Sequence, residues 1–145
     1  MAKSHLKQVE WILSLQDDFI DEAVRALTTE IQAELQQSTP VKTGWAASNW
    51  LATLSKPATT SVGSKESVNK TSAPGRVARV TAAFDAKKHR RVYLTNHVPY
   101  VMSLNDGTTK THKAPIGFIQ MSITRGVNRT ESAMRRYKPS ALKGR

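Results

Sequence analysis

The first segment of the sequence places the strongest constraint on the fold. Residues 4–37 contain neither proline nor glycine, and large apolar residues recur there at the three- and four-residue spacing of one helix face. This pattern predicts a helix about 50 Å long if it is unbroken. Asp17 or Asp18 can also cap the start of a second helix, so we expect one long helix or two collinear ones. The apolar face consists of Val9, Leu13, Ile20, Val24, Leu27, Ile31 and Leu35.

Strand and loop patterns follow the first proline of the chain. Residues 48–54 predict a strand with Trp50 and Ala52 on the same side, and residues 92–95 predict a second strand. Between them, residues 55–75 are rich in Ser, Thr, Gly, Lys, Asn and Pro. Such a composition predicts a long exposed loop, and loops of this length commonly serve binding or assembly.

Helical spacing returns twice in the second half of the chain. Residues 76–90 carry Val77, Val80 and Phe84 at helical intervals, which predicts a helix with its basic residues outside. A last helix is predicted to begin near Gly117. Its inward residues are expected to be Phe118, Met121, Ile123 and Val127.

The order of these elements, from helix to strand to helix to strand to helix, predicts an α+β fold. We expect a small, mostly antiparallel sheet packed against the long N-terminal helix and the C-terminal helix. The chain is interpreted as a single domain over residues 1–145. Its long helix covers 4–37, its α+β body 38–130, and a flexible basic tail 131–145.

Charge is unevenly distributed along the chain. The net charge is +11, yet residues 1–40 hold seven acids and three bases, whereas residues 41–145 hold four acids and nineteen bases. A basic body attracts DNA, RNA or an acidic protein surface, and the same charge also serves plain solubility. The chain has no cysteine, which excludes disulfides and thiolate metal sites and fits a reducing cytoplasm. No apolar run has the length of a membrane span, so no membrane partner is expected.

Catalytic patterns are absent from the sequence. Its four histidines are scattered, and none pairs at helical spacing with another metal-ligating residue. Phosphate-binding loops, nucleotide-binding glycine patterns and serine-nucleophile motifs are missing. The paired carboxylates Asp17–Asp18 and Asp21–Glu22 are expected on a solvated helix face, where helix capping and solubility explain them. We therefore expect no enzyme, no cofactor, no metal site and no catalytic residue.

Two short blocks combine turn residues with aromatic anchors. The first is TPVKTGWAASNW (39–50), in which a Thr-Gly turn precedes two tryptophans. The second is VYLTNHVPYVMSLNDG (92–107), in which a β-type run stops and Pro99 opens a short apolar helix. Asn and Asp favour turns, and Gly107 can adopt the left-handed backbone that ends a helix.

These blocks carry a resemblance to a known family. The chain resembles the tail-component, or neck and tail-completion, proteins of tailed bacteriophages. Members of that family have a leading helix, a segment of the form TP-V-(D/K)-TG-(R/W)-x-x-SNW, a segment of the form (V/I)Y(L/I)TN-x-(V/L/A)PY-x-x-x-LN-(D/E)G, and AP-x-GF opening a last helix. This chain matches them at 39–50, 92–107 and 114–118. The resemblance extends from Asp17 to about Arg129 and is poor over 55–91.

The resemblance implies a structural virion protein, made in the host cytoplasm, at the neck or tail-completion position between head and tail. It implies a homo-oligomeric ring, a hexamer or dodecamer, that docks on the head-side connector or portal adaptor and on the tail tube or tail terminator. Phage DNA passing through the ring is a further expected partner. In such proteins the second block lies near subunit contacts. The interface candidates are Trp45, Trp50, Tyr100, Leu104, Asn105, Asp106 and Gly107.

A small basic protein that binds DNA without sequence preference is the alternative. Residues 87–91 (KKHRR) and 135–138 (RRYK) are short basic clusters of the kind that contacts phosphates. No helix-turn-helix, zinc knuckle or RNA-recognition motif accompanies them, so any binding is expected to ignore base sequence.

Overall fold

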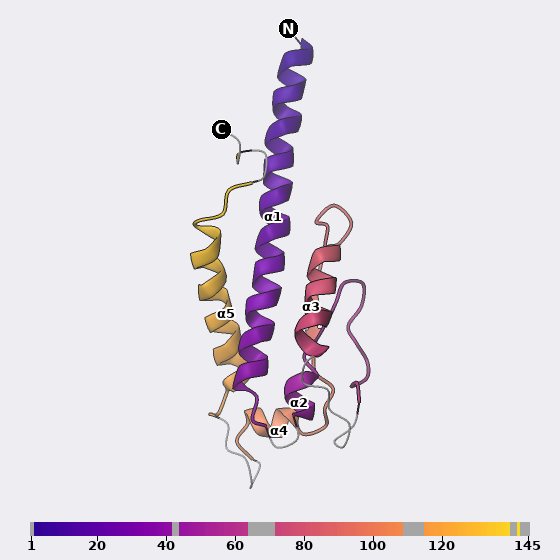
Figure 1. Ribbon diagram of the computed structural model, residues 1–145, viewed down its shortest axis with the longest axis vertical. Coiled ribbons are helices and arrows are strands. Elements are labelled where there is room, and N and C mark those ends of the chain that lie inside the picture. Colours follow the sequence, from indigo (N-terminus) through magenta and orange to yellow (C-terminus); the bar gives the residue numbers. More distant parts are fainter. Residues whose placement is uncertain (1, 42–43, 64–71, 109–114, 140–141, 143–145) are drawn as a thin grey trace.

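The computed structural model describes residues 2–41, 44–63, 72–108, 115–139 and 142. Five helices and two strands follow one another in these residues, and the picture of the whole chain is dominated by one long helix (Figure 1). The elements are α1 (Ala2–Ser38), α2 (Trp45–Ser48), β1 (Leu51–Thr53), α3 (Ser72–Ala83), β2 (Tyr93–Thr95), α4 (Val101–Asn105) and α5 (Phe118–Met134).

The N-terminal segment is a single continuous helix. α1 spans Ala2–Ser38, which corresponds to a length of about 55 Å at the usual rise per residue. Asp17 and Asp18 lie inside it, so no second helix starts there. The helix ends at Ser38, and the backbone N–H of the next residue, Thr39, still donates to the carbonyl oxygen of Leu35 at 3.0 Å. Pro40 then prevents continuation, because the residue before a proline disfavours the helical conformation.

Two shorter helices flank α1, α5 on one side and α3 on the other (Figure 1). Both run antiparallel to it. Along α5, Ser122 contacts Glu34 while Arg129 reaches back to Glu30. Along α3 and the turn after it, contacts likewise move toward the N-terminal end of α1 as the chain advances. The N-terminal part of α1 extends beyond both neighbours, and every side chain from residue 5 to residue 14 is exposed.

The contact between α1 and α5 is made by a small residue. A Cβ atom placed on Gly126 would lie 2.6 Å from the Ile31 side chain and only 2.7–2.8 Å from Ile31 backbone atoms. The two helix backbones therefore approach as closely as a glycine allows. Ser122 and Thr130 lie one turn to each side of Gly126, and all three are buried.

The orientation predicted for the last helix is wrong. Of the residues expected to point inward, Phe118 is buried as predicted, but Met121, Ile123 and Val127 are exposed, and Ser122, Gly126 and Thr130 are buried in their place. The apolar pattern misled because close helix contact selects small side chains rather than large ones. Ser122 and Thr130 tolerate burial because their hydroxyls donate to backbone carbonyls, that of Glu34 and that of Gly126.

The α+β class is confirmed. β1 and β2 form a two-stranded antiparallel sheet in which Ala52 pairs with Leu94, and the long N-terminal helix and the C-terminal helix are both present. The strands are shorter than predicted. Ser48 belongs to the short helix α2 rather than to the first strand. β1 also contacts α3, which links the sheet to the helical layer.

The central segment differs from its prediction at both ends. α3 begins at Ser72 and ends at Ala83, whereas a helix over 76–90 was expected. Its first turn includes Pro74 and Gly75, which fits the tolerance of a helix start for proline. The predicted loop 55–75 is thus shorter, and its residues 64–71 lie outside the described residues.

The C-terminal tail also begins later than predicted. α5 continues through residue 134, inside the segment 131–145 that was expected to be flexible. Beyond the helix, the Tyr137 ring lies 6.3 Å from the Phe19 ring of α1, measured between centroids. Residues 109–114, 140–141 and 143–145 lie outside the described residues.

The hydrophobic core lies at one end of the molecule, where α1 ends. It joins residues from the end of α1, from α2 and from the chain around α4 and the start of α5. Its buried members are Leu35, Ala46, Trp50, Val98, Val101, Leu104 and Phe118. None of the helices that the structure describes has both the length and the apolar character needed to cross a lipid bilayer.

The approach at Gly126 predicts an unusual substitution effect. Gly→Ala inside a helix normally stabilises it by about 1 kcal/mol. Gly126→Ala is expected to destabilise the protein by roughly 1–3 kcal/mol, because the new methyl group overlaps the Ile31 backbone. Urea unfolding followed by circular dichroism measures the change. Thr124→Ala, an exposed position on the same helix, is the control and should change stability little; a stabilised Gly126→Ala variant would contradict the close packing.

Candidate assembly surface

The two blocks singled out in the sequence lie against each other in the structure. The Trp45 and Tyr100 rings pack with centroids 6.1 Å apart and planes tilted by 58°. The side-chain amide of Asn96 donates to the carbonyl oxygen of Ala46 at 2.8 Å. β1 pairs with β2 at the edge of the same region. Residues about 50 positions apart in the chain therefore build one corner of the molecule.

Asn49 holds the segment after β1 onto this corner. Its side-chain amide donates to the carbonyl oxygens of Trp45 at 2.8 Å and Val62 at 3.0 Å, and its Oδ1 accepts from the Val62 backbone N–H at 2.6 Å. The indole N–H of Trp45 also donates to the Val62 carbonyl, at 3.1 Å. This arrangement pairs Asn49 with both backbone groups of Val62, so it fixes the position of a segment that has no regular secondary structure.

Trp50 connects the first block to the end of α1. Its indole N–H donates to the hydroxyl oxygen of Thr39 at 2.9 Å, and that hydroxyl donates in turn to the carbonyl oxygen of Leu35. All three residues are buried. A tryptophan can be buried at low cost when its N–H finds a partner, and here the partner also caps the last turn of α1.

Asn105 connects α4 to α5. Its Oδ1 accepts the backbone N–H of Ile119 at 2.9 Å, and its backbone carbonyl accepts the N–H of Gly117 at 2.8 Å. Gly117 and Gly107 both have the left-handed backbone, with φ of 76° and 70°. The expected helix stop at Gly107 is thus present, and a Cβ there would meet the Ile116 side chain at 2.9 Å.

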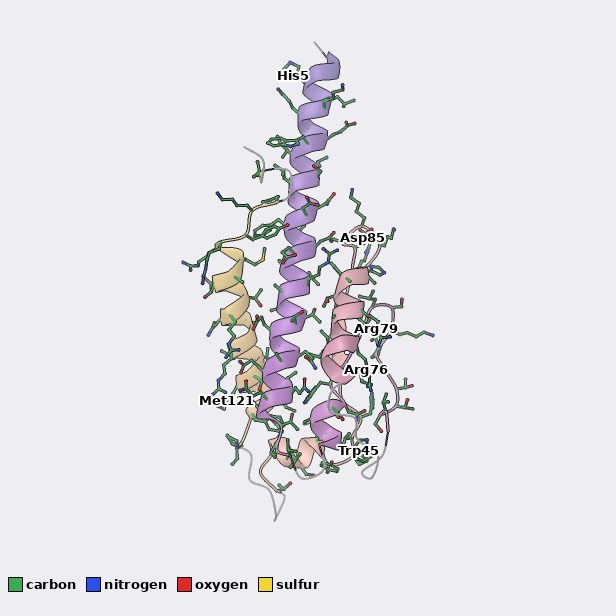
Figure 2. All side chains as sticks on the ribbon, in the orientation of Figure 1. His5, Trp45, Arg76, Arg79, Asp85 and Met121 are labelled. Carbon is green, nitrogen blue, oxygen red and sulfur yellow. The ribbon has the colours of Figure 1, made fainter. Side chains whose placement is uncertain are left out.

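The predicted interface residues divide into two groups. Trp50, Leu104 and Asn105 are buried within the chain and support its own fold. Asp106 and Gly107 are exposed, and the other two, Trp45 and Tyr100, are half-buried. Figure 2 places Trp45 at the same end of the molecule as α2 and α4. A role in subunit contacts stays a prediction for all seven, and the buried three could serve it only by positioning the accessible ones.

Exposed apolar residues that the sequence did not single out lie beside these blocks. Val41, Met102 and Ile116 are all exposed, and Ile116 is 76% accessible. Their segments follow α1, form part of α4 and precede α5, all at the core end of the molecule (Figure 1). We call these three residues the lower patch. The sequence offered one weak signal of their exposure, the turn residues on either side of them. An exposed Ile or Val cannot otherwise be told from a core residue in a sequence.

A second exposed apolar surface lies at the other end of α1. Leu6, Val9, Ile12, Leu13 and Ile20 are 39–62% exposed, and we call them the upper stripe. Figure 2 shows His5 far beyond the ends of α3 and α5. The prediction that the apolar face of α1 packs against the domain is thus wrong for this half. It fails because the neighbouring elements that make the α1 contacts above extend only as far as Asp17 and Phe19.

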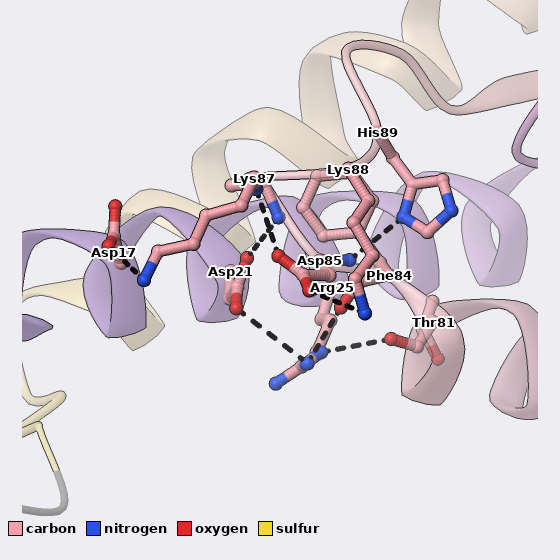
Figure 3. Close-up of polar contacts among 10 residues, drawn as sticks. Asp17, Asp21, Arg25, Thr81, Phe84, Asp85, Lys87, Lys88 and His89 are labelled. Atoms are coloured by element: carbon pink, nitrogen blue, oxygen red, sulfur yellow. Dashed lines mark hydrogen bonds and ion pairs between the residues drawn. The ribbon is translucent and has the colours of Figure 1, made fainter.

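The turn after α3 binds the acidic side of α1 (Figure 3). Asp21 Oδ1 accepts the backbone N–H of Ala86 at 2.7 Å, and Lys87 Nζ lies 3.1 Å from Asp17 Oδ2. Arg25 donates to the carbonyl oxygens of Thr81 and Phe84 at 2.9 and 2.8 Å, which are groups left unpaired at the end of α3. The expectation of solvated carboxylates is therefore wrong for Asp17 and Asp21.

The same turn pairs part of the basic cluster 87–91. The hydrogen bond to Asp17 raises the pKa of Lys87, and the backbone N–H of Lys87 lowers the pKa of Asp85. Lys88 Nζ lies 3.4 Å from Asp85 Oδ2. His89 Nδ1 also accepts the backbone N–H of Asp85, at 3.1 Å. At least three of the five residues in this cluster are thus engaged within the protein, and the pairing of Lys87 and Lys88 reduces the charge the cluster can offer to phosphate groups.

A further ion pair closes the contact between α1 and α5. Glu34 is buried, and its Oε1 lies 2.7 Å from Nη1 of the more exposed Arg129 without the alignment of a hydrogen bond. Within the described part of the chain, no group of three or more histidine or carboxylate side chains is placed to hold a metal ion.

Comparisons with known proteins give no relative. No protein-family model matches the sequence, and neither a curated protein nor a solved structure matches it significantly. The resemblance carried by the two blocks therefore rests on their own residues.

The Asn49 contacts predict a large effect for a small substitution. Asn49→Ala leaves the Val62 N–H without its partner and removes one donor from the carbonyl oxygens of Trp45 and Val62, so stability should fall by roughly 1–3 kcal/mol. Urea unfolding gives the value. Asn128→Ala, at an exposed position of α5, controls for the chemical change, and an equal effect at both positions would show that Asn49 does not hold this segment.

Proposed function

We propose that this protein is a structural component of the virion of a tailed phage, at the neck or tail-completion position between head and tail. It forms a homo-oligomeric ring, a hexamer or dodecamer. One side docks on the head-side connector or portal adaptor and the other on the tail tube or tail terminator. The role needs no chemical reaction, because shape and charge complementarity perform it.

The placement of exposed apolar side chains is the observation that carries this proposal. The upper stripe and the lower patch lie at opposite ends of an elongated molecule. Apolar surface of this kind favours burial against a partner. Two such surfaces at opposite ends suit a subunit that has at least two separate neighbours in an assembly. The order and spacing of the three resembling segments support the same role.

Exposed bases suit the passage of DNA. Arg125, Arg129, Arg135 and Arg136 are exposed along and just after α5. Acidic side chains partly neutralise this row, since Glu131 Oε1 lies 2.6 Å from Arg135 Nη2 and Glu34 Oε1 lies 2.7 Å from Arg129 Nη1. The remaining positive charge would attract DNA phosphates without reading their sequence.

The lower patch gives a direct test in phage production. Met102→Asp is expected to leave the fold intact, because this side chain is 56% exposed, and to leave DNA-filled heads and separate tails that never join. An introduced charge at an apolar contact opposes its burial. Electron microscopy of lysates, with the variant supplied in place of the wild type, provides the measurement.

Met121→Asp is the matched control for that test. Met121 is 41% exposed and lies on the side of α5 away from α1 (Figure 2). It should support normal particles. Infectious particles from the folded Met102→Asp variant would remove the lower patch from the contact with the connector or tail.

Non-specific DNA binding is the second candidate, and the exposed arginines of α5 favour it. Affinity should then fall with salt by roughly 0.9 log units per phosphate contact for each tenfold rise in salt concentration. Fluorescence anisotropy with two unrelated duplexes measures this slope and should give equal affinities. Tight binding to one sequence that survives high salt would contradict a purely electrostatic contact.

A further inference from the structure

The upper stripe is an exposed apolar surface that the described part of its own subunit leaves largely uncovered. Its five residues fall on one face of α1, because their positions follow helical spacing from Leu6 to Ile20. A helix of about this length is marginally stable in water when nothing covers its apolar face. The stripe is about 21 Å long at 1.5 Å per residue.

A groove lies lower on the same molecule, between α1 and α3. It has a volume of about 750 Å³ and extends along α1 from Glu22 to Gln36, which again corresponds to about 21 Å. Its lining combines small side chains, among them Ala26, Thr29, Ala33, Ala78 and Ala82, with the longer polar side chains of Glu22, Arg25, Glu30, Gln32 and Gln36. Large side chains such as leucine and isoleucine pack well into the spaces that alanines leave.

We propose that the upper stripe of one copy of this chain occupies the α1–α3 groove of a neighbouring copy. Stripe and groove match in length, and one offers large apolar side chains where the other offers small ones. Both lie on the single continuous helix α1. Because an unbroken helix cannot fold back on itself, a chain cannot fill its own groove, and the occupant must come from another copy.

This contact joins two different surfaces, so each bound copy still offers one stripe and one groove. Such a head-to-tail interface produces a ring when its rotation closes and a filament when it does not. The stripe–groove proposal rests on the ring proposed above, which requires the contact to close. It specifies which surfaces form the contact between subunits. In this contact the exposed N-terminal half of α1 is covered by the C-terminal half of α1, and by α3, of the neighbouring copy.

Cysteine crosslinking tests the contact directly, because the natural chain has no cysteine. Leu13 is the midpoint of the stripe and Thr29 the midpoint of the groove, so the two meet whichever way the bound helix runs. A Leu13→Cys chain mixed with a Thr29→Cys chain of different mass should form mixed crosslinked dimers with a short bismaleimide. Ala33→Cys samples the groove one turn further. Met121→Cys, on the outer side of α5, is the control and should not crosslink to Leu13→Cys.

Each outcome decides the question. A double variant carrying both Leu13→Cys and Thr29→Cys should give a ladder of crosslinked multiples that ends at the ring size. Crosslinking of Leu13→Cys to itself alone would show that stripes pair with each other and would overturn the proposal. Crosslinking to Met121→Cys, or no crosslinking to either groove position, would overturn it as well.

Sedimentation velocity gives a second, independent measurement. Leu13→Asp should weaken self-association at least about tenfold, because the new charge would have to be buried in the contact with the groove. The melting temperature of the monomeric variant should stay unchanged, because Leu13 is 53% exposed. Met121→Asp should associate like the wild type. A wild-type chain that remains monomeric at every concentration would overturn the proposal.

The two proposals can fail separately. If Leu13→Cys and Thr29→Cys crosslink into rings but phage assembly does not require the protein, the neck role alone is overturned. A phage that requires the protein but assembles normally with the folded Leu13→Asp variant would overturn the stripe contact alone.

Discussion

The backbone approach of α1 and α5 at Gly126 governs the rest of the structure. Because no side chain separates the helices at Ile31, the neighbouring small residues on α5 are drawn into contact with α1 as well. The same approach buries Glu34, whose charge is then met by Arg129 from the outer side of the interface. A buried carboxylate without that partner would be costly, so packing and charge are coupled along one helix pair.

Polar contacts rather than apolar area hold the loops to this helical framework. Asn49, Asn96 and Asn105 each accept or donate backbone hydrogen bonds at a point where the chain reverses. Arg25 does the same for the end of α3. Each of these side chains satisfies backbone groups that lack a partner in regular secondary structure. The main apolar cluster can therefore remain small, at the end of the molecule where α1 ends.

The sequence predicted what depends on local pattern and missed what depends on distant partners. The long helix, the second strand and the stop at Gly107 follow from periodicity and turn chemistry, and all are present. The inward face of α5 was wrong because a glycine contact reverses the rule that large apolar residues lie inside. The binding of Asp21 to the Ala86 amide could not be foreseen, since 65 positions separate the two residues. For the candidate site, the two blocks were identified, whereas the exposed Val41, Met102 and Ile116 had no distinguishing signal.

The uneven cover of α1 gives one helix two levels of local stability. Residues 21–36 are held by neighbours on two sides, while residues 5–14 are exposed all round. In an isolated subunit the backbone amides of the exposed turns would open by fraying and exchange their hydrogens quickly, whereas those of the covered turns would open only with the domain. Protection against hydrogen exchange would thus rise along a helix that has no break in its geometry. Where a neighbouring molecule covers the exposed turns, that gradient in protection disappears. Hydrogen exchange along α1 therefore distinguishes an isolated subunit from an assembled one.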